Sequence, residues 1–165
     1  MLCSYWASAG LWVPAADKEN VSTSHPAILF PSGHSRLAWR EPSAQLIAFN
    51  LACVRGIVTL GYDPVGQGER RMFPDLDGHG GVVANGTEHY SPAFEHEYLQ
   101  RQSTLLGVNV ANAWVNDLVI LTDYLSSLPF VDASRLGVAG CSGGGVQAAY
   151  VGAMDPRMSV ASIAW

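Results

Sequence analysis

A glycine-rich pentapeptide near the end of the chain has the residue types and spacing of a nucleophilic site. Gly140-Cys141-Ser142-Gly143-Gly144 fits the pattern G-x-S-x-G. A serine hydroxyl is a weak nucleophile and must be held clear of the backbone, within reach of a base. A sharp turn from a strand into a helix does this, provided that the flanking positions lack side chains, here Gly140 and Gly144. We therefore predict that Ser142 is a nucleophile. Cys141 is the alternative, but it occupies the wrong position of the motif.

The elements that must position this turn alternate between strands and helices. Apolar runs predict strands at 11–14 (an edge strand), 27–30, 57–62, 135–140 and 160–165. Helices are expected after Pro42, over 110–128 and over 144–152, with apolar stripes at Leu46, Phe49, Cys53 and at Val110, Trp114, Leu118, Leu121, Leu125, Leu128. This order predicts an α/β fold, a mainly parallel sheet with helices on both faces. Ligands bind beyond the carboxyl ends of the strands in such sheets, where Ser142 lies.

Composition limits the function classes. The chain has 165 residues, 48% of them hydrophobic and 14% charged, with a net charge of −5. That length predicts one domain, and the apolar content excludes a disordered tail protein. Lys18 is the only lysine, so a nucleic-acid partner is not expected. No apolar run reaches the roughly 18 residues that a membrane span requires. The three cysteines form no CxxC pair, and Cys53 is expected in the core.

Three segments share motifs with a known superfamily: 26–34, Gly61-Tyr62-Asp63-Pro64-Val65-Gly66-Gln67-Gly68-Glu69, and Gly140-Cys141-Ser142-Gly143-Gly144-Gly145. From about residue 11 onward the chain resembles the α/β-hydrolases, and more narrowly their acetyl xylan esterase-like (carbohydrate esterase-type) branch. The resemblance implies an α/β-hydrolase domain over 1–165 and a serine esterase that works through an acyl-enzyme. It also implies that Asp63 shapes a turn beneath the site. No cofactor and no metal are expected.

Two backbone N–H groups are the candidates for an oxyanion hole. The N–H of Gly143 begins the helix after the serine and points where a tetrahedral oxyanion would form. In the hydrolase architecture the second donor comes from the loop after the first buried strand, here Pro31-Ser32-Gly33-His34-Ser35, which makes the His34 N–H the best candidate. The His34 side chain is an alternative base. Because the base follows the serine in this architecture, we interpret it as a loop histidine that hydrogen-bonds to backbone.

A long segment, 64–108, separates the second buried strand from the next long helix and is expected to be an insert over the site. Ser91-Pro92 predicts the start of a helix with Phe94, Tyr98 and Leu99 on its apolar side. Six residues of the insert raise a metal hypothesis: Asp75, Asp77, His79, His89, Glu95 and His96. Their spacing matches neither an EF-hand nor HExxH, so we favour a solvated loop without metal.

The partners that a catalytic serine needs are missing after it. The triad order is Ser, Asp or Glu, then His. Asp155 is the only acidic residue after Ser142, the resemblance gives it a packing or turn role, and no histidine follows. We therefore expect the chain to be the N-terminal part of a longer hydrolase, with little or no esterase turnover alone.

The leading interpretation is a serine hydrolase of a small-molecule or carbohydrate ester, with an acetyl ester as the expected substrate. A peptidase or dienelactone-type hydrolase uses the same turn and is the nearest enzymatic alternative. The non-enzymatic alternative is a pseudo-enzyme or binding module that keeps the fold. Residues 1–6 show no signal-peptide pattern, and both a secreted and a cytoplasmic location stay open, as does the oligomeric state.

Overall fold

The computed structural model describes residues 7–15, 24–72 and 92–164. Its centre is a five-stranded sheet in the order β1-β3-β2-β4-β5. Strands β2 to β5 are mutually parallel, and β1 pairs antiparallel with β3 at one edge. The strands are β1 (Ala9–Trp12), β2 (His25–Pro31), β3 (Val58–Tyr62), β4 (Val131–Cys141) and β5 (Met158–Ala164). The expected mainly parallel α/β sheet is confirmed, and the expected edge strand is present as β1, which pairs antiparallel.

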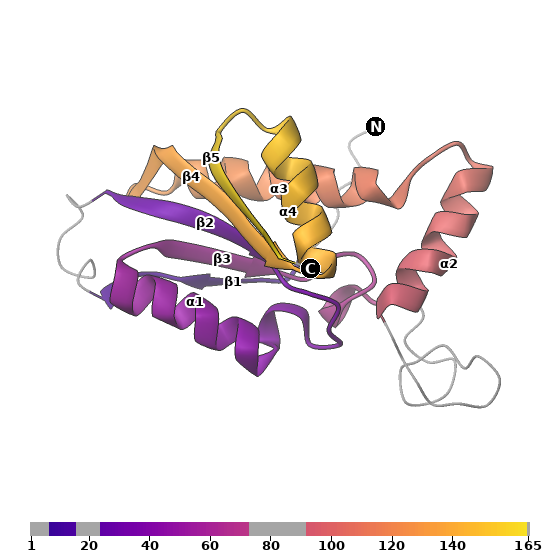
Figure 1. The fold of residues 1–165 in the computed structure, drawn as a ribbon, viewed down its shortest axis with the longest axis horizontal. Coiled ribbons are helices and arrows are strands. Elements are labelled where there is room, and N and C mark those ends of the chain that lie inside the picture. The colour runs from indigo at the N-terminus through magenta and orange to yellow at the C-terminus, as the bar shows by residue number, and fades with distance from the viewer. Residues whose placement is uncertain (1–6, 16–23, 73–91, 165) are drawn as a thin grey trace.

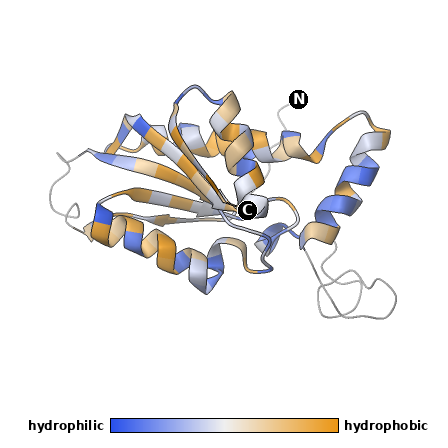
Figure 2. Ribbon diagram, viewed as in Figure 1, coloured by the Kyte–Doolittle hydropathy of each residue, from blue (hydrophilic) through white to orange (hydrophobic). Residues whose placement is uncertain are grey.

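Helices cover both faces of the sheet, as expected (Figure 1). Helix α1 (Pro42–Arg55) lies on one face, and α3 (Val110–Ser127) and α4 (Gly143–Met154) lie on the other. Helix α2 (Pro92–Leu105) lies beyond the carboxyl ends of the strands and is largely hydrophilic, whereas the strands are mainly hydrophobic (Figures 1 and 2). The short 3-10 helices η2 (Ala38–Arg40) and η3 (Gly68–Arg70) belong to the loops at the same end.

The main core lies between the sheet and α3 with α4. The apolar stripe expected on α3 is buried at Trp114, Leu118, Leu121 and Leu125, and it packs against residues of the central strands such as Leu29. Asn109 caps this helix, since its side chain accepts a hydrogen bond from the Ala111 N–H at 2.9 Å. This core holds the carboxyl ends of β2, β3 and β4 in fixed relative positions.

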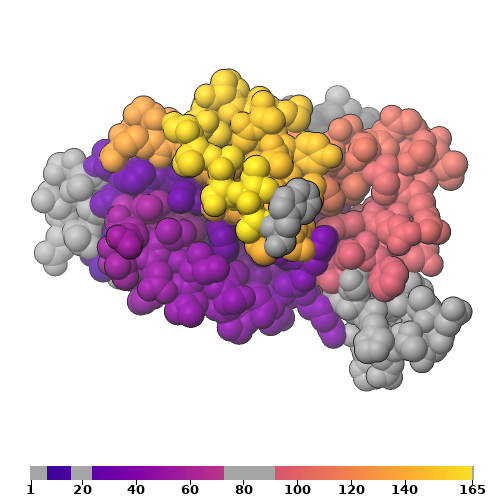
Figure 3. Space-filling model, in the orientation of Figure 1, coloured from indigo at the N-terminus to yellow at the C-terminus, as the bar shows by residue number. Residues whose placement is uncertain are grey.

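The apolar stripe expected on α1 is wrong. Leu46 and Phe49 are 62% and 55% exposed, and Cys53 is exposed as well. The buried face consists of the alanines Ala44, Ala48 and Ala52. Small side chains let a helix backbone lie close to a sheet, so this alanine face packs inward although its residues are less hydrophobic. The outward face of α1 lies at the molecular surface in Figure 3.

Two further expectations need correction. Strand β4 begins at Val131, which pairs with His25, so this strand starts four residues before the expected range of 135–140. Helix α2 exists within the 64–108 segment, but Phe94 and Tyr98 are exposed. Its buried residues are Pro92, Glu95 and His96. The two polar side chains contact the loop after β3, and the His96 ring also packs against Trp114 of α3.

Among the described residues, no single helix is long and apolar enough to span a membrane. Helices α2 and α3 reach that length and hydropathy only when they are taken together, and they are bent by 107° relative to each other.

Three loops meet where the parallel strands end. The registers place Pro31 of β2 opposite Tyr62 of β3, and Cys141 of β4 opposite Ala164 of β5. The loops that follow β2, β3 and β4 therefore start at the same end of the sheet, where the carboxyl ends of these strands lie. This end of the sheet holds Ser142, Gly143 and the loop that carries His34.

Candidate active site

Ser142 occupies the turn between β4 and α4 and has an unusual backbone. Its φ is 54° and its ψ is −122°. Positive φ is uncommon for residues with a side chain, and a residue held there costs on the order of 1–3 kcal/mol. The Ser142 N–H donates to the Ala164 carbonyl at 2.9 Å, and its carbonyl accepts from the Val146 N–H at 3.0 Å. The surrounding strand and helix therefore hold the conformation that leaves this side chain exposed.

Close backbone contacts explain the glycines around Ser142. A Cβ on Gly140 would lie 2.2 Å from the Gly144 carbonyl oxygen, and a Cβ on Gly144 would lie 2.1 Å from the Pro31 carbonyl oxygen. A Cβ on Gly145 would lie 2.3 Å from the Ala164 carbonyl oxygen. Real Cβ atoms do not approach an oxygen so closely, so each of these positions requires glycine for reasons of packing.

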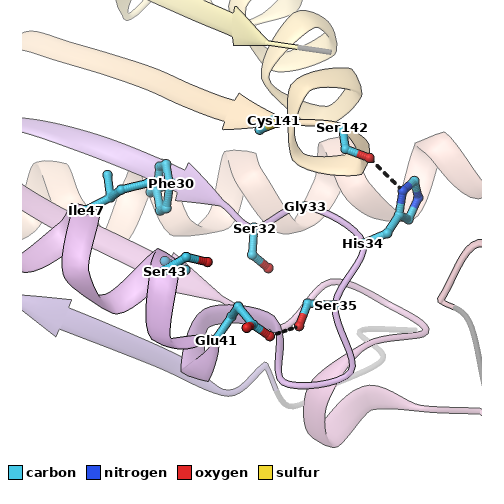
Figure 4. Close-up of a pocket in the computed structure, with 11 residues that line it drawn as sticks. Phe30, Ser32, Gly33, His34, Ser35, Glu41, Ser43, Ile47, Cys141 and Ser142 are labelled. Carbon is cyan, nitrogen blue, oxygen red and sulfur yellow. Dashed lines mark hydrogen bonds between the residues drawn. The ribbon is translucent and has the colours of Figure 1, made fainter.

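His34 lies beside Ser142, with its ring Nδ1 3.1 Å from the serine Oγ (Figure 4). Among the described residues its side chain hydrogen-bonds to the candidate nucleophile and not to backbone, which corrects the interpretation from the sequence. Burial lowers the pKa of His34, although part of its ring is exposed, so the imidazole is neutral at neutral pH. A neutral ring with a free lone pair on Nδ1 can accept the Ser142 proton.

His96 of α2 forms the wall behind His34. Its ring centroid lies 5.3 Å from that of His34 and 4.9 Å from that of Trp114. Its Nε2 donates to the Val65 carbonyl at 2.8 Å, and Nδ1 is buried with no partner in the described residues. Burial lowers the pKa of His96 to about 4. His96 is thus a neutral packing residue, and its contact with His34 connects the 64–108 segment to the site.

Two buried glutamines hydrogen-bond to backbone carbonyls in the loop that carries His34 and in the turn that carries Ser142. Gln67 donates from Nε2 to the carbonyls of Gly33 and Ser35, at 2.9 and 3.1 Å. Gln147 donates from Nε2 to the Gly143 carbonyl at 3.2 Å and accepts a hydrogen bond from the Tyr62 hydroxyl. Sequence reasoning missed both glutamines. The signal available for Gln67 was its place between two glycines in a loop that follows a buried strand.

Asp63 directly follows β3, at the same carboxyl end of the strands as Ser142, but its side chain is fully buried and paired with Arg40. Its Oδ2 accepts from Arg40 at 2.8 Å and from the Glu69 N–H at 3.0 Å. Arg70 donates to the Asp63 carbonyl at 3.1 Å and to the Asp117 carboxylate at 2.5 Å. These contacts fit the turn-forming role that the resemblance implied for Asp63.

The other acidic and metal-candidate residues lie apart from Ser142 or outside the described residues. Asp155 pairs with Arg157, whose hydrogen bonds lower the pKa of this carboxyl. Of the residues behind the metal hypothesis, Asp75, Asp77, His79 and His89 lie outside the described residues. Glu95 accepts from the Met72 N–H at 2.9 Å. Within the described ranges no three His, Cys, Asp or Glu side chains form a group that could hold a metal ion.

A pocket of about 480 Å³ opens beside Ser142, between the loop after β2 and the start of α1 (Figure 4). Its polar wall includes Ser32 and Glu41, and its apolar wall includes Phe30 and Ile47. Glu41 accepts a hydrogen bond from Ser35 at 2.5 Å. A pocket of this size and mixed polarity next to a reactive group can hold a small organic ligand.

Comparison with solved structures identifies the architecture. A candidate acetyl xylan esterase from Bacteroides fragilis matches with a TM-score of 0.64 and 17% identity, over 91% of this chain and 38% of that one. Est1E from Butyrivibrio proteoclasticus, solved with ferulic acid, matches with a TM-score of 0.57 and 18% identity, over 92% of this chain and 45% of that one. An α/β hydrolase from Penicillium sp. sh18 matches with a TM-score of 0.56 and 19% identity, over 97% of this chain and 45% of that one.

The sequence alone finds no such relatives. No protein-family model matches it, and neither does any curated protein. The chain spans less than half of the length of each of the three solved structures, and their identities, all below 20%, establish the fold and not the activity. The strained serine turn, the parallel sheet and these matches agree: the chain has the α/β-hydrolase fold.

Proposed function

We propose that the chain carries the nucleophile and the oxyanion hole of a serine hydrolase that acts on carboxylic esters, with acetyl esters of carbohydrates or small alcohols as its substrates. The observation that carries the proposal is the geometry of Ser142, an exposed serine at φ 54° whose Oγ lies 3.1 Å from a neutral imidazole. This combination of strain, exposure and a hydrogen-bonded base is what activates a hydroxyl group.

The reaction follows from these positions. Ser142 Oγ attacks the ester carbonyl carbon while its proton moves to an imidazole nitrogen, and the carbonyl electron pair moves onto the oxygen. The N–H groups of Gly143 and His34 stabilise that oxyanion. Its collapse breaks the ester C–O bond, the imidazole returns the proton to the leaving alkoxide, and water then hydrolyses the acyl-enzyme.

The proposed turnover of this chain alone is low. In a triad a carboxylate orients the imidazole and stabilises its protonated form. In the described residues, the only side-chain hydrogen bond of His34 is the one to Ser142, and its lowered pKa makes it a weaker base. His34 therefore supports slow acylation by Ser142 rather than efficient turnover.

The ester substrate is supported by similarity. Est1E was solved with ferulic acid bound, and another structural match is a cold-adapted esterase from an Arctic intertidal metagenomic library, with 20% identity and a TM-score of 0.58. A candidate dipeptidyl aminopeptidase from Bacteroides ovatus also matches, with 17% identity and a TM-score of 0.54, so a peptidase is the enzymatic alternative. A non-catalytic binding module is favoured only by the lack of a carboxylate partner for His34 among the described residues.

The test is covalent labelling of the purified chain with a fluorophosphonate, followed by peptide mapping. We expect labelling at Ser142 that requires native protein and is absent after heat denaturation. Slow hydrolysis of p-nitrophenyl acetate should accompany it and should be lost in S142A. A native chain that takes up no label at Ser142 would exclude the hydrolase and leave the binding module.

A further inference from the structure

Gln67 is a fully buried side chain directly beneath the loop that carries the proposed second oxyanion donor. Its amide nitrogen donates one hydrogen bond to the Gly33 carbonyl at 2.9 Å and one to the Ser35 carbonyl at 3.1 Å. A side-chain amide has two N–H donors, so both are used on this loop. These two carbonyls flank His34 on either side in the chain.

The Gly33 carbonyl and the His34 N–H belong to the same peptide unit. That unit is planar and trans, so its C=O and N–H point in opposite directions. A hydrogen bond that fixes the carbonyl therefore also fixes the direction of the N–H, which points away from Gln67. The bond also polarises the peptide and makes the N–H a stronger donor.

The loop that carries Gln67 is built to place it there. Gly66 and Gly68 have φ values of 83° and 57°, which glycine adopts without strain. A Cβ at residue 68 would lie 2.3 Å from the Asp63 carboxyl carbon, and one at residue 66 would lie 3.0 Å from the His96 ring. The Gly68 N–H also donates to the Arg36 carbonyl at 3.2 Å. The two loops are thus joined at more than one point.

We propose that Gln67 is a positioning residue for oxyanion stabilisation, which orients the peptide between Gly33 and His34 so that its N–H faces the reacting carbonyl. The inference rests on the proposed function. Gln67 is buried and touches no substrate, so it acts only through this peptide.

A positioning role and a merely structural role make different predictions. A residue that only fills space affects stability and leaves the chemistry of the folded molecules unchanged. A residue that orients an oxyanion donor lowers the rate of the chemical step and leaves ground-state binding unchanged, since the oxyanion exists only in the transition state. Loss of a whole oxyanion donor lowers rates by about 100- to 1,000-fold, so misalignment of one donor should lower them by about tenfold.

The experiment measures phosphonylation of Ser142 in the full chain at several fluorophosphonate concentrations. This separates the maximal rate constant from the concentration that gives half of it. In Q67M, which keeps the length of the side chain and removes both donors, the rate constant should fall about tenfold while the half-saturating concentration changes by less than about twofold. The matched control is Q45M, because Gln45 also donates to a backbone carbonyl, that of Arg40 at 2.7 Å, but lies on the exposed side of α1.

Each result decides between the two roles. A Q67M rate constant equal to that of the wild type, with wild-type protein labelled normally, would overturn the positioning role and leave the proposed function intact. Absence of labelling in the wild type would overturn the proposed function and this role with it. If Q67M loses its cooperative melting transition, Q67N, which keeps a shorter amide, replaces it. The His34 backbone amide should also shift in ¹H–¹⁵N spectra of the variant, and the same amide in Q45M should not.

Discussion

Two turns at the same edge of the sheet place a polar residue directly after a buried strand, and they treat it in opposite ways. Ser142 follows β4, adopts φ 54° and exposes its hydroxyl beside His34. Asp63 follows β3, is fully buried, and its carboxylate accepts a hydrogen bond from Arg40. The first turn holds the proposed nucleophile in a strained conformation, and its hydroxyl has no charged partner among the described residues. The second turn pairs Oδ2 of its buried carboxylate with Arg40 and the Glu69 N–H, while Oδ1 has no partner in the described residues. The two turns therefore differ in whether the polar group is exposed or anchored.

The largest expected effect is the loss of reactivity in S142A. Removal of the nucleophile should lower phosphonylation and ester hydrolysis at least about 1,000-fold. Stability should be unchanged or slightly higher, since alanine removes no intramolecular contact other than that with His34. Rate measurements and urea unfolding of the same preparations test both halves. In C141A the rate should stay within about threefold of the wild type; a loss as large as that in S142A would reassign the nucleophile to Cys141.

The next effect concerns the packing of the serine turn. A Cβ at Gly144 would lie 2.1 Å from the Pro31 carbonyl oxygen, so G144A must push β2 and α4 apart. We expect a loss of about 3 kcal/mol in unfolding free energy, together with slower phosphonylation because Gly143 moves as well. Gly107 is the control, since it has φ 71° but a Cβ added there would meet no atom within 4 Å. G107A should cost only about 1 kcal/mol, and an equal loss in both variants would contradict the packing argument.

If Asp63 anchors its turn, its substitution should lower stability and leave reactivity unchanged, which is the reverse of the effect expected for S142A. Asn at this position removes the charge that Arg40 faces, and breaking a buried pair costs about 3–5 kcal/mol. Because Arg40 is 31% exposed, we expect about 2 kcal/mol in D63N by urea unfolding. Phosphonylation per folded molecule should be unchanged. The control is D132N, whose exposed partner Arg135 leads us to expect a smaller loss. A D63N protein of normal stability but low reactivity would place Asp63 in the site itself.

The two turns also differ in what the sequence could predict. The motif around Ser142 and the strand before it are local, and a local pattern was enough to locate the turn and its glycines. The contact between His34 and Ser142 joins residues 108 positions apart, and the Gln67 bonds to the loop after β2 span 34 and 32 positions. Such contacts depend on the register of β2, β3 and β4, which residue spacing does not encode.

Helix faces show the same limit. The spacing of Leu46 and Phe49 correctly predicted a helix, but the face that packs on the sheet is the alanine face, because close approach of the backbone outweighs the hydrophobicity of single residues. On α2 the buried side chains after Pro92 are the polar Glu95 and His96, since they hydrogen-bond to the loop after β3. On α3 the stripe of large apolar residues was predicted correctly, because there the partner is the core itself.

The smallest expected effect tests His96, which connects the loop after Asp63 to the loop that carries His34. His96 donates to Val65 in the loop after Asp63 and packs against His34 in the other loop. Burial lowers its pKa from 6.5 to about 4 in the folded chain. Between these values the unfolded chain binds a proton that the folded chain does not, so the stabilisation that is complete above pH 6.5 is lost as the pH falls toward 4.

One such proton accounts for at most about 1.4 kcal/mol per pH unit. We expect the unfolding free energy, measured in urea at pH 7, 5.5 and 4.5, to decrease over this range in the wild type and to decrease less in H96Q, whose amide can still donate to Val65. The exposed control is H34Q, which should keep most of the wild-type slope because the burial of His34 is only partial. Equal slopes in the wild type and H96Q would show that the neutral state of His96 does not account for the pH dependence of stability. A steeper slope in H34Q than in H96Q would attribute the pH dependence of the unfolding free energy to His96 and not to His34.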